Sequence, residues 1–271
     1  MTDEAKDSKL DPVAERQRWI TFASRLLTLC VEIQKTSDVP VTEREFADPK
    51  ILALALLGRT YMNLKGVIAV AKEGLVVEVR TLARSCFENF FYAAKLVEKG
   101  DEFVTAMYDH ERSSIRSRGQ FVLDLDDLDP LGAEVVKQLR SRLRTLKPQR
   151  PNAKLLNPKE VVSDSVIKPA YLFFSQLSAD AAHPSITALK RHWGRSVENG
   201  EQIWILDIHP VEKGTEVADS LNVACFAVLS ACVAVNQILD GTPANALLNQ
   251  LWLEYRTMSG WGANDAQIKA C

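Results

Sequence analysis

Residues 221–239, LNVACFAVLSACVAVNQIL, form a run without a charged side chain, and this run most constrains how the chain can fold. A helix that is apolar on all sides must be shielded on all sides, either by protein or by a bilayer. Asn222, Ser230, Asn236 and the many small Ala and Cys residues favour packing against other helices, and we find no second segment of comparable apolarity. We therefore predict a buried central helix and no membrane association.

The composition indicates a folded protein with one large core. The chain has 271 residues, of which 46% are hydrophobic and 25% are charged. Its net charge of −2 excludes the global positive field of a typical nucleic-acid binder. Nucleic acid is therefore not expected as a partner, except through a local basic patch. Five cysteines without a C-x-x-C pair and a polar N-terminus without a signal peptide favour the cytoplasm.

Apolar periodicity and helix start signals predict a mainly all-α fold. Asp11-Pro12 and Asp48-Pro49 each combine an N-cap with Pro at the first helical position. We expect a helical bundle of about seven or eight helices in a single domain, 1–271, with a soft boundary in the loop 147–158. The helices are expected at residues 12–35, 49–73, 75–99, 102–123, 130–146, 166–182, 215–239 and 243–258.

One small β-hairpin is predicted as an insertion near residues 186–208. The segment ITALKRHWGRSV-ENGE-QIWILDI contains Asn199-Gly200, which suits a type I′ turn. Counting outward from that turn predicts three opposed pairs: Arg195 with Trp204, Trp193 with Leu206, and His192 with Asp207.

Two arginines interrupt the apolar face of the helix at 75–99. Arg80 falls inside the apolar sector and Arg84 at its edge, with Glu88 one turn further on. A guanidinium facing a core must find a partner, and an arginine pair in a partly desolvated site binds phosphate or carboxylate. An ordinary i,i+4 pair between Arg84 and Glu88 is the structural alternative. His110 lies on the apolar stripe of the next helix, where a core histidine is the alternative to a ligand-binding one.

A second candidate set lies at the end of the helix 166–182. Ser178 and His183 stand in SADAAHPS, where the helix dipole favours a protonated imidazole. We expect no metal site, because the glutamates and Glu-x-x-His pairs of a di-metal bundle are not found. We also expect no cofactor, since no Gly-rich phosphate loop is present, and Cys86 lies on an apolar helix face that suits no reactive thiolate.

The stretch at 137–154, KQLRSRLRTLKPQRPNAK, is locally positive. Such a stretch can contact phosphates, but a solvated helix face is the interpretation that the sequence favours.

The motifs around both candidate sets are similar to those of a known family. RTLARSCFENFFYAAKL carries an Arg-x-x-x-Glu helix (Arg84, Glu88), and SADAAHPS carries Ser178, His183 and a following Ser185. In these features the chain resembles the bacterial domain-of-unknown-function family numbered fifty-six seventy-seven, over roughly residues 50–240. The resemblance implies a helical bundle with a polar pocket and names no reaction.

A weaker similarity connects the chain to HEPN-type helical ribonucleases of bacterial toxin and antiphage systems. Those proteins also combine long bundle helices with an Arg–His pair. Their Arg-x(4–6)-His spacing is absent here at His110, His183, His192 and His209.

Three functional hypotheses follow, and whether the protein is an enzyme stays open. In the first, six residues converge on an interhelical pocket that binds an anionic small ligand or a nucleotide-like group: Arg80, Arg84, Glu88, His110, Ser178 and His183. In the second, the protein is a toxin-like or antiphage ribonuclease with His183, Arg84 and Glu88 as catalytic residues. In the third, it is an interaction module or homo-oligomer that uses Trp193, Trp204 and the hairpin edge.

Overall fold

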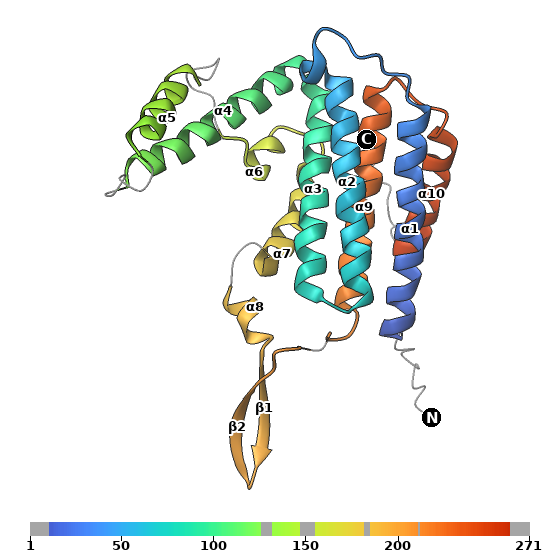
Figure 1. Cartoon of the computed structure of the whole chain (residues 1–271). Helices are drawn as coiled ribbons and strands as arrows, with labels where there is room; N and C mark the ends of the chain where they lie inside the picture. Colours follow the sequence, from blue (N-terminus) through green and yellow to red (C-terminus); the bar gives the residue numbers. More distant parts are fainter. Residues whose placement is uncertain (1–10, 126–131, 147–154, 182–184, 211, 261–271) are drawn as a thin grey trace.

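The computed structural model describes residues 11–125, 132–146, 155–181, 185–210 and 212–260. The predicted all-α fold with one small hairpin is confirmed (Figure 1). Within the described residues, the chain forms helices α1 (Pro12–Thr36), α2 (Pro49–Lys72), α3 (Val76–Lys99), α4 (Asp101–Leu123), α5 (Ala133–Thr145), α6 (Pro158–Val161), α7 (Tyr171–Ala181), α8 (Ile186–Lys190), α9 (Glu216–Ile238) and α10 (Asn245–Ser259). Two 3-10 turns, η1 (Glu45–Ala47) and η3 (Lys168–Ala170), and strands β1 (Trp193–Glu198) and β2 (Glu201–Leu206) complete it.

Local signals set the beginnings of the long N-terminal helices. The Asp11 side chain accepts a hydrogen bond from the Val13 amide at 3.0 Å, and Pro12 occupies the first turn of α1. Asp48 caps α2 in the same way, through the Lys50 amide at 2.8 Å. Gly74, with a φ of +73°, then reverses the chain so that α2 and α3 lie antiparallel.

Helix α9 is the centre of the bundle, and the predicted burial of this segment is confirmed. It packs against α1, α2, α3 and α10 (Figure 1). Its small side chains, including Ala224, Ala227 and Ala231, are buried and allow the neighbouring helices to approach closely. The expectation that no second segment is comparably apolar was wrong. By length and composition, α2 and α9 could each cross a membrane, but 72% of the apolar window of α9 is buried within the protein.

An aromatic cluster joins α3 to α7 and α9, two of the helices that pack against it. Phe87 of α3 is fully buried, and its ring centroid lies 6.2 Å from that of Phe226 of α9. It lies 6.2 Å from Phe173 of α7 as well, and Phe91 contacts Phe174. Aromatic pairs at this separation contribute both apolar burial and edge-to-face or offset packing. The cluster fixes α7 against the same helix that carries Arg80 and Arg84.

Helices α4 and α5 form an arm that extends away from the bundle (Figure 1). The two helices meet at Gly119, which packs against the end of the Leu143 side chain. A Cβ atom at residue 119 would lie 2.6 Å from the Leu143 side chain.

The hairpin has the predicted register, but it is shorter than expected. Trp193 is opposite Leu206, Arg195 is opposite Trp204, and the Asp207 amide donates to the His192 carbonyl at 2.8 Å. Residues 186–190, expected in the first strand, instead form α8. The Ser185 hydroxyl caps this helix by accepting from the Ala188 amide at 3.1 Å. This capping interaction outweighs the β propensity of so short a segment.

Three further predicted helix boundaries differ or lie outside the described residues. The helix expected from Val166 begins at Tyr171, after the 3-10 turn η3, which includes Pro169. The predicted start at Pro130 and the predicted stop at His183-Pro184 lie outside the described part of the chain.

Truncation of the central aromatic should destabilise the bundle. Phe87→Ala removes a fully buried ring that touches α7 and α9, so we expect a loss of about 3–5 kcal/mol in the free energy of unfolding, measured by urea denaturation. Phe46→Ala, at a side chain that is 64% exposed, is the control and should change it by less than about 0.5 kcal/mol. Equal losses in the two variants would contradict this assignment of the core.

Candidate functional site

A polar strip of three residues follows α3 on the side that contacts α7 and α9. Arg80, Arg84 and Glu88 are spaced by four residues, so they lie above one another on the same helix face. Helix α3 packs against both α7 and α9, so side chains on this strip meet partners from distant parts of the chain. The guanidinium groups therefore lie at an interface rather than in an apolar core.

Arg84 is held by three groups at once. Its Nε donates to the Ser178 hydroxyl at 2.9 Å, and its Nη2 lies 3.1 Å from the Glu88 carboxylate. The guanidinium also stacks over Phe174, 4.7 Å from the ring centroid. Ser178 in turn donates to the Phe174 carbonyl at 2.7 Å, which fixes its hydroxyl as an acceptor for Arg84. These contacts attach α7 to α3 by polar interactions beside the aromatic cluster.

One turn towards the start of α3, the strip continues into a carboxylate shared by two arginines. Glu216, the first residue of α9, accepts a bidentate pair from Arg191, with both N–O distances at 2.9 Å. Arg80 Nη2 lies 3.9 Å from the same carboxylate, and the Lys213 amide donates to it at 3.2 Å. The hydrogen bonds from Arg191 lower the pKa of Glu216 below its ordinary value, and they outweigh the opposing effect of burial.

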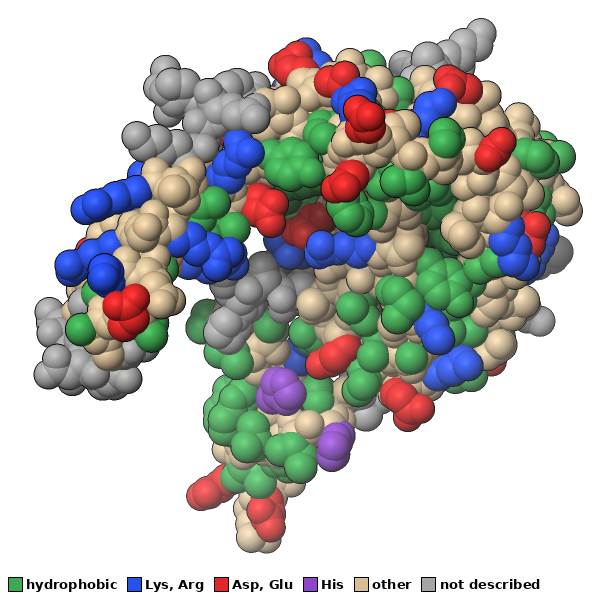
Figure 2. All heavy atoms as spheres, turned by 45° about the horizontal axis from the view of Figure 1, so that its top comes forward, with side chains coloured by type: hydrophobic (Ala, Val, Ile, Leu, Met, Phe, Trp, Pro, Cys, Tyr) green, Lys and Arg blue, Asp and Glu red, His purple; other side chains and the backbone are tan. Residues whose placement is uncertain are grey.

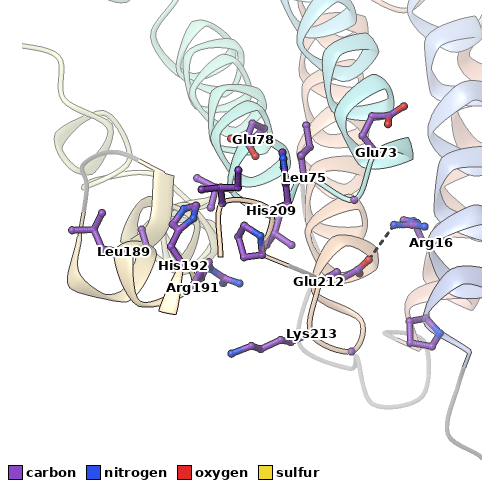
Figure 3. Close-up of a pocket in the computed structure, with 18 of the residues that line it drawn as sticks. Arg16, Glu73, Leu75, Glu78, Leu189, Arg191, His192, His209, Glu212 and Lys213 are labelled. Atoms are coloured by element: carbon purple, nitrogen blue, oxygen red, sulfur yellow. Dashed lines mark hydrogen bonds and ion pairs between the residues drawn. The ribbon is translucent and has the colours of Figure 1, made fainter. Parts of the chain in front are cut away.

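Arg191 connects this network to an open cavity of about 940 Å³ at the end of the bundle (Figure 3). Helices α1 and α3 both begin at this end (Figure 1), and α8 and residues 208–210 and 212–214 close one side. Figure 3 shows Arg191 and His192 on one side of the cavity and Arg16 of α1 on the other. The apolar part of the lining comes from Pro12, Val13, Leu75, Val76, Val77, Ala188, Leu189, Ile208 and Pro210.

The charged groups of the cavity differ in how far they are already engaged. Glu212 pairs with Arg16 at 3.1 Å and accepts from the Val217 amide at 2.9 Å, so it caps α9. The Lys213 ammonium, in contrast, makes no ion pair with a described carboxylate. His209 also lines the cavity, and its backbone amide donates to the Asp207 carboxylate at 2.8 Å. Its imidazole makes no hydrogen bond with a described residue, so the ring is available to a ligand.

The α3 terminus that borders this cavity has no side-chain cap. Leu75 occupies the N-cap position and cannot accept a hydrogen bond through its side chain. The amides of the first turn therefore add positive partial charge to the cavity. The Glu73 and Glu78 carboxylates at its rim carry charge of the opposite sign.

The structure joins four of the six predicted site residues. Arg84, Glu88 and Ser178 are in direct contact, and Arg80 extends the same strip to Glu216. His110 is engaged elsewhere, because its Nδ1 accepts from the Leu156 amide at 3.0 Å. His183 lies outside the described residues.

Several residues of the network had no clear sequence signal. Glu212 and Glu216 stand just before the uncharged run, and Arg191 appeared as one of three basic residues near the hairpin. Each is distant in sequence from its partner, so no local spacing links Arg191 to Glu216 or Arg16 to Glu212.

No group of three or more His, Cys, Asp or Glu side chains that could hold a metal ion occurs among the described residues. Cys86 is completely buried, and this burial raises the pKa of its thiol well above the ordinary value. A thiol in this setting stays protonated and is a poor nucleophile.

Comparison with known proteins finds a match to a family model. The model of a family of unknown function, DUF5677, matches residues 50–202, which confirms the resemblance seen in the sequence and covers α2 through the start of β2. No curated protein and no solved structure matches the chain.

The shared carboxylate should make stability depend on pH. The folded-state pKa of Glu216 is below its ordinary value of 4.5, so its contribution is fully present above that pH and is lost as the pH falls through the folded-state pKa. Glu216→Gln should therefore destabilise the protein near neutral pH, and the difference from wild type should shrink below about pH 4.5. Urea denaturation across this range measures it.

Glu43→Gln is the matched control, because Glu43 is exposed and makes no side-chain contact with a described residue. This variant should follow the wild-type stability at every pH. A constant difference between Glu216→Gln and wild type from neutral to acidic pH would refute the shared-carboxylate interpretation.

Proposed function

The chain belongs to DUF5677, a family of unknown function, and we propose that it binds an anionic small ligand of nucleotide-like chemistry in the cavity at the end of the bundle. The observation that carries this proposal is the cavity itself, where a large apolar lining meets basic side chains. A cavity of about 940 Å³ is within the size range of small-molecule sites. Such a lining suits a ligand with a flat apolar part and one anionic group.

Two carboxylates near the cavity are paired with arginines, and this pairing supports a negatively charged ligand. Glu212 and Glu216 are neutralised by Arg16 and Arg191, so they do not repel an anion strongly. Lys213, His209 and the uncapped first turn of α3 remain as donors. An anion that lies beside these donors meets unsatisfied positive charge, which is the condition for a favourable charge-assisted hydrogen bond, while Glu73 and Glu78 at the rim carry the opposing charge.

The Arg80–Arg84 strip has a supporting role in this proposal. Its guanidinium groups are held by Glu88, Ser178 and Glu216, so they orient α7 and α9 around α3. Through Glu216 the strip fixes Arg191, which lines the cavity.

Adenosine 5′-monophosphate is the probe that tests the proposal. Isothermal titration calorimetry should detect binding to the wild type, and Lys213→Ala should weaken it about ten- to hundredfold, the usual value of a hydrogen bond to a charged group. His209→Ala should weaken it as well. Adenosine without the phosphate should bind less tightly than the monophosphate.

The control is Lys65→Ala, which removes an exposed lysine of α2 outside the cavity. It should leave the affinity unchanged. The absence of measurable heat with both adenosine 5′-monophosphate and inorganic phosphate at about 1 mM would exclude this ligand class.

The exposed hairpin supports a second function, the formation of a homo-oligomer. The side chains of Trp193 and Trp204 are 50% and 60% exposed, and Leu206 beside them is exposed too. They share one face of a sheet that has only two strands, and two-stranded sheets are marginally stable alone. A second copy packed on this face would bury the tryptophans, which are enriched in interface centres.

Mass in solution tests this second function. The wild type should behave as a dimer or larger species in light scattering after size exclusion, and Trp193→Ala with Trp204→Ala should shift it towards the monomer. Phe46→Ala removes an exposed aromatic outside the hairpin and should not change the mass. An identical mass for wild type and the double variant would remove the support for oligomerisation through the hairpin.

The ribonuclease hypothesis has no comparable support among the described residues. It depends on His183 as general acid and base, and His183 lies outside them. Arg84, the proposed charge-stabilising group, is engaged with Glu88, Ser178 and Phe174.

A further inference from the structure

The arm formed by α4 and α5 carries a second surface, which is rich in basic side chains. It extends from the bundle, and Figure 2 shows Lys and Arg side chains gathered on it. The contact between Gly119 and Leu143 defines the line along which the two antiparallel helices meet. Positions on the arm can be assigned to one side or the other by their offset from this line.

Equal offsets from the contact place residues of the two helices on the same side of the arm. Arg116 and Arg140 each stand three residues before their contact residue, which is about 60° to one side at 100° per residue. Two antiparallel helices are related by a two-fold axis perpendicular to the plane that contains both. This axis exchanges the positions of Arg116 and Arg140, so both arginines lie on the same side of that plane. Arg144, one residue after Leu143, lies about 100° towards the same side. We name Arg116, Arg140 and Arg144 the basic face.

A second arginine pair lies on the opposite side of the arm. Arg118 and Arg142 each stand one residue before Gly119 and Leu143, about 100° in the other direction. The arm thus presents two pairs that are equivalent in helix position and charge but differ in side.

The arginines of the basic face are exposed and make no ion pair or side-chain hydrogen bond with a described residue. The described carboxylates of the arm form no ion pair with these arginines. Asp109 and Asp124 fall on the same side by helical offset, but Asp109 is buried beside Arg112, and the Asp124 carboxylate accepts from the Gln120 side-chain amide at 2.7 Å. Glu134 stands opposite Leu143 on the outer side of α5, where it pairs with Lys137. Glu111 shares the side of Arg118. The basic face therefore keeps its charge.

We propose that the basic face binds the phosphodiester backbone of a nucleic acid. Exposed arginines with free guanidinium groups match phosphate oxygens bidentately, and such contacts supply affinity without reading sequence. The overall charge of −2 leaves little long-range repulsion at the arm. The proposal is independent of the cavity, because the arm supplies no residue to its lining.

The same surface does not fit a bilayer. A helix that binds a membrane surface combines its basic residues with large apolar side chains that enter the lipid. The exposed apolar residues of the arm, Phe121 and Val135, point away from the basic face by the same helical offsets. A bound membrane would therefore leave either the arginines or these side chains without their preferred partner.

The matched arginine pairs provide the experiment. Fluorescence anisotropy would follow the full-length protein binding to labelled single-stranded RNA, single-stranded DNA and duplex DNA of about 20 nucleotides or base pairs. Three phosphate contacts predict a slope of about −2 for log affinity against log salt with single strands. Arg116→Gln with Arg140→Gln should reduce the affinity at least tenfold at low salt and reduce the slope by about 1.4.

Arg118→Gln with Arg142→Gln removes the same charge from the other side and should change the affinity less than twofold. Circular dichroism of both double variants should match the wild type. Equal losses in the two pairs would overturn the proposal, because they would indicate a general charge effect. It would also be overturned if the wild type bound none of the oligonucleotides, or if phosphatidylserine vesicles or polyglutamate bound as tightly. The relative affinities of RNA and DNA identify the source of the phosphodiester.

Discussion

The burial of a helix that carries a long charge-free run determines the rest of this structure. Helix α9 can exist in water only when other helices cover it, and α1, α2, α3 and α10 supply that cover. The small side chains of α9, such as Ala227 and Ala231, let α3 approach closely, and Phe87 and Phe226 fill the remaining space. Because α3 is held on two sides, by α9 and by α7, its polar residues meet elements that are distant in sequence.

The polar strip of α3 shows how the bundle accommodates charge at such an interface. Arg84 is satisfied by Glu88, Ser178 and the face of Phe174, while Arg80 reaches the carboxylate that Arg191 holds. The contacts of Arg84 with Ser178 and Phe174 connect α3 to α7, and the contact of Arg80 with Glu216 connects α3 to α9. The strip therefore stabilises the packing of these helices and, through Glu216, positions Arg191 at the cavity. The structural role of Arg80 and Arg84 is therefore compatible with ligand binding in the cavity. These arginines orient the residues of the cavity, and other residues supply its free positive charge.

Two parts of the chain project from the bundle and carry exposed side chains. The α4–α5 arm presents exposed arginines, and the hairpin presents exposed tryptophans beside Arg195, whose guanidinium lies 4.6 Å from the Trp204 ring centroid. Neither surface is covered by a described part of the chain. We propose a different kind of contact for each of these features: a small anion for the cavity, a phosphodiester backbone for the arm and a second copy of the chain for the hairpin.

The sequence by itself determined the elements whose causes are local. Asp-Pro caps, apolar periodicity and Asn199-Gly200 act within a few residues, so helix starts, the buried run and the hairpin register could be predicted. The first functional hypothesis placed Arg84 and Ser178 in one pocket, but it did not pair the two side chains. Tertiary structure alone decided that His110 bonds the Leu156 amide, that Arg191 and Arg80 share Glu216, and that Arg116 and Arg140 lie on one side of an arm. These contacts join residues whose separation along the chain carries no periodic signal, because packing of whole helices, rather than backbone geometry, brings them together.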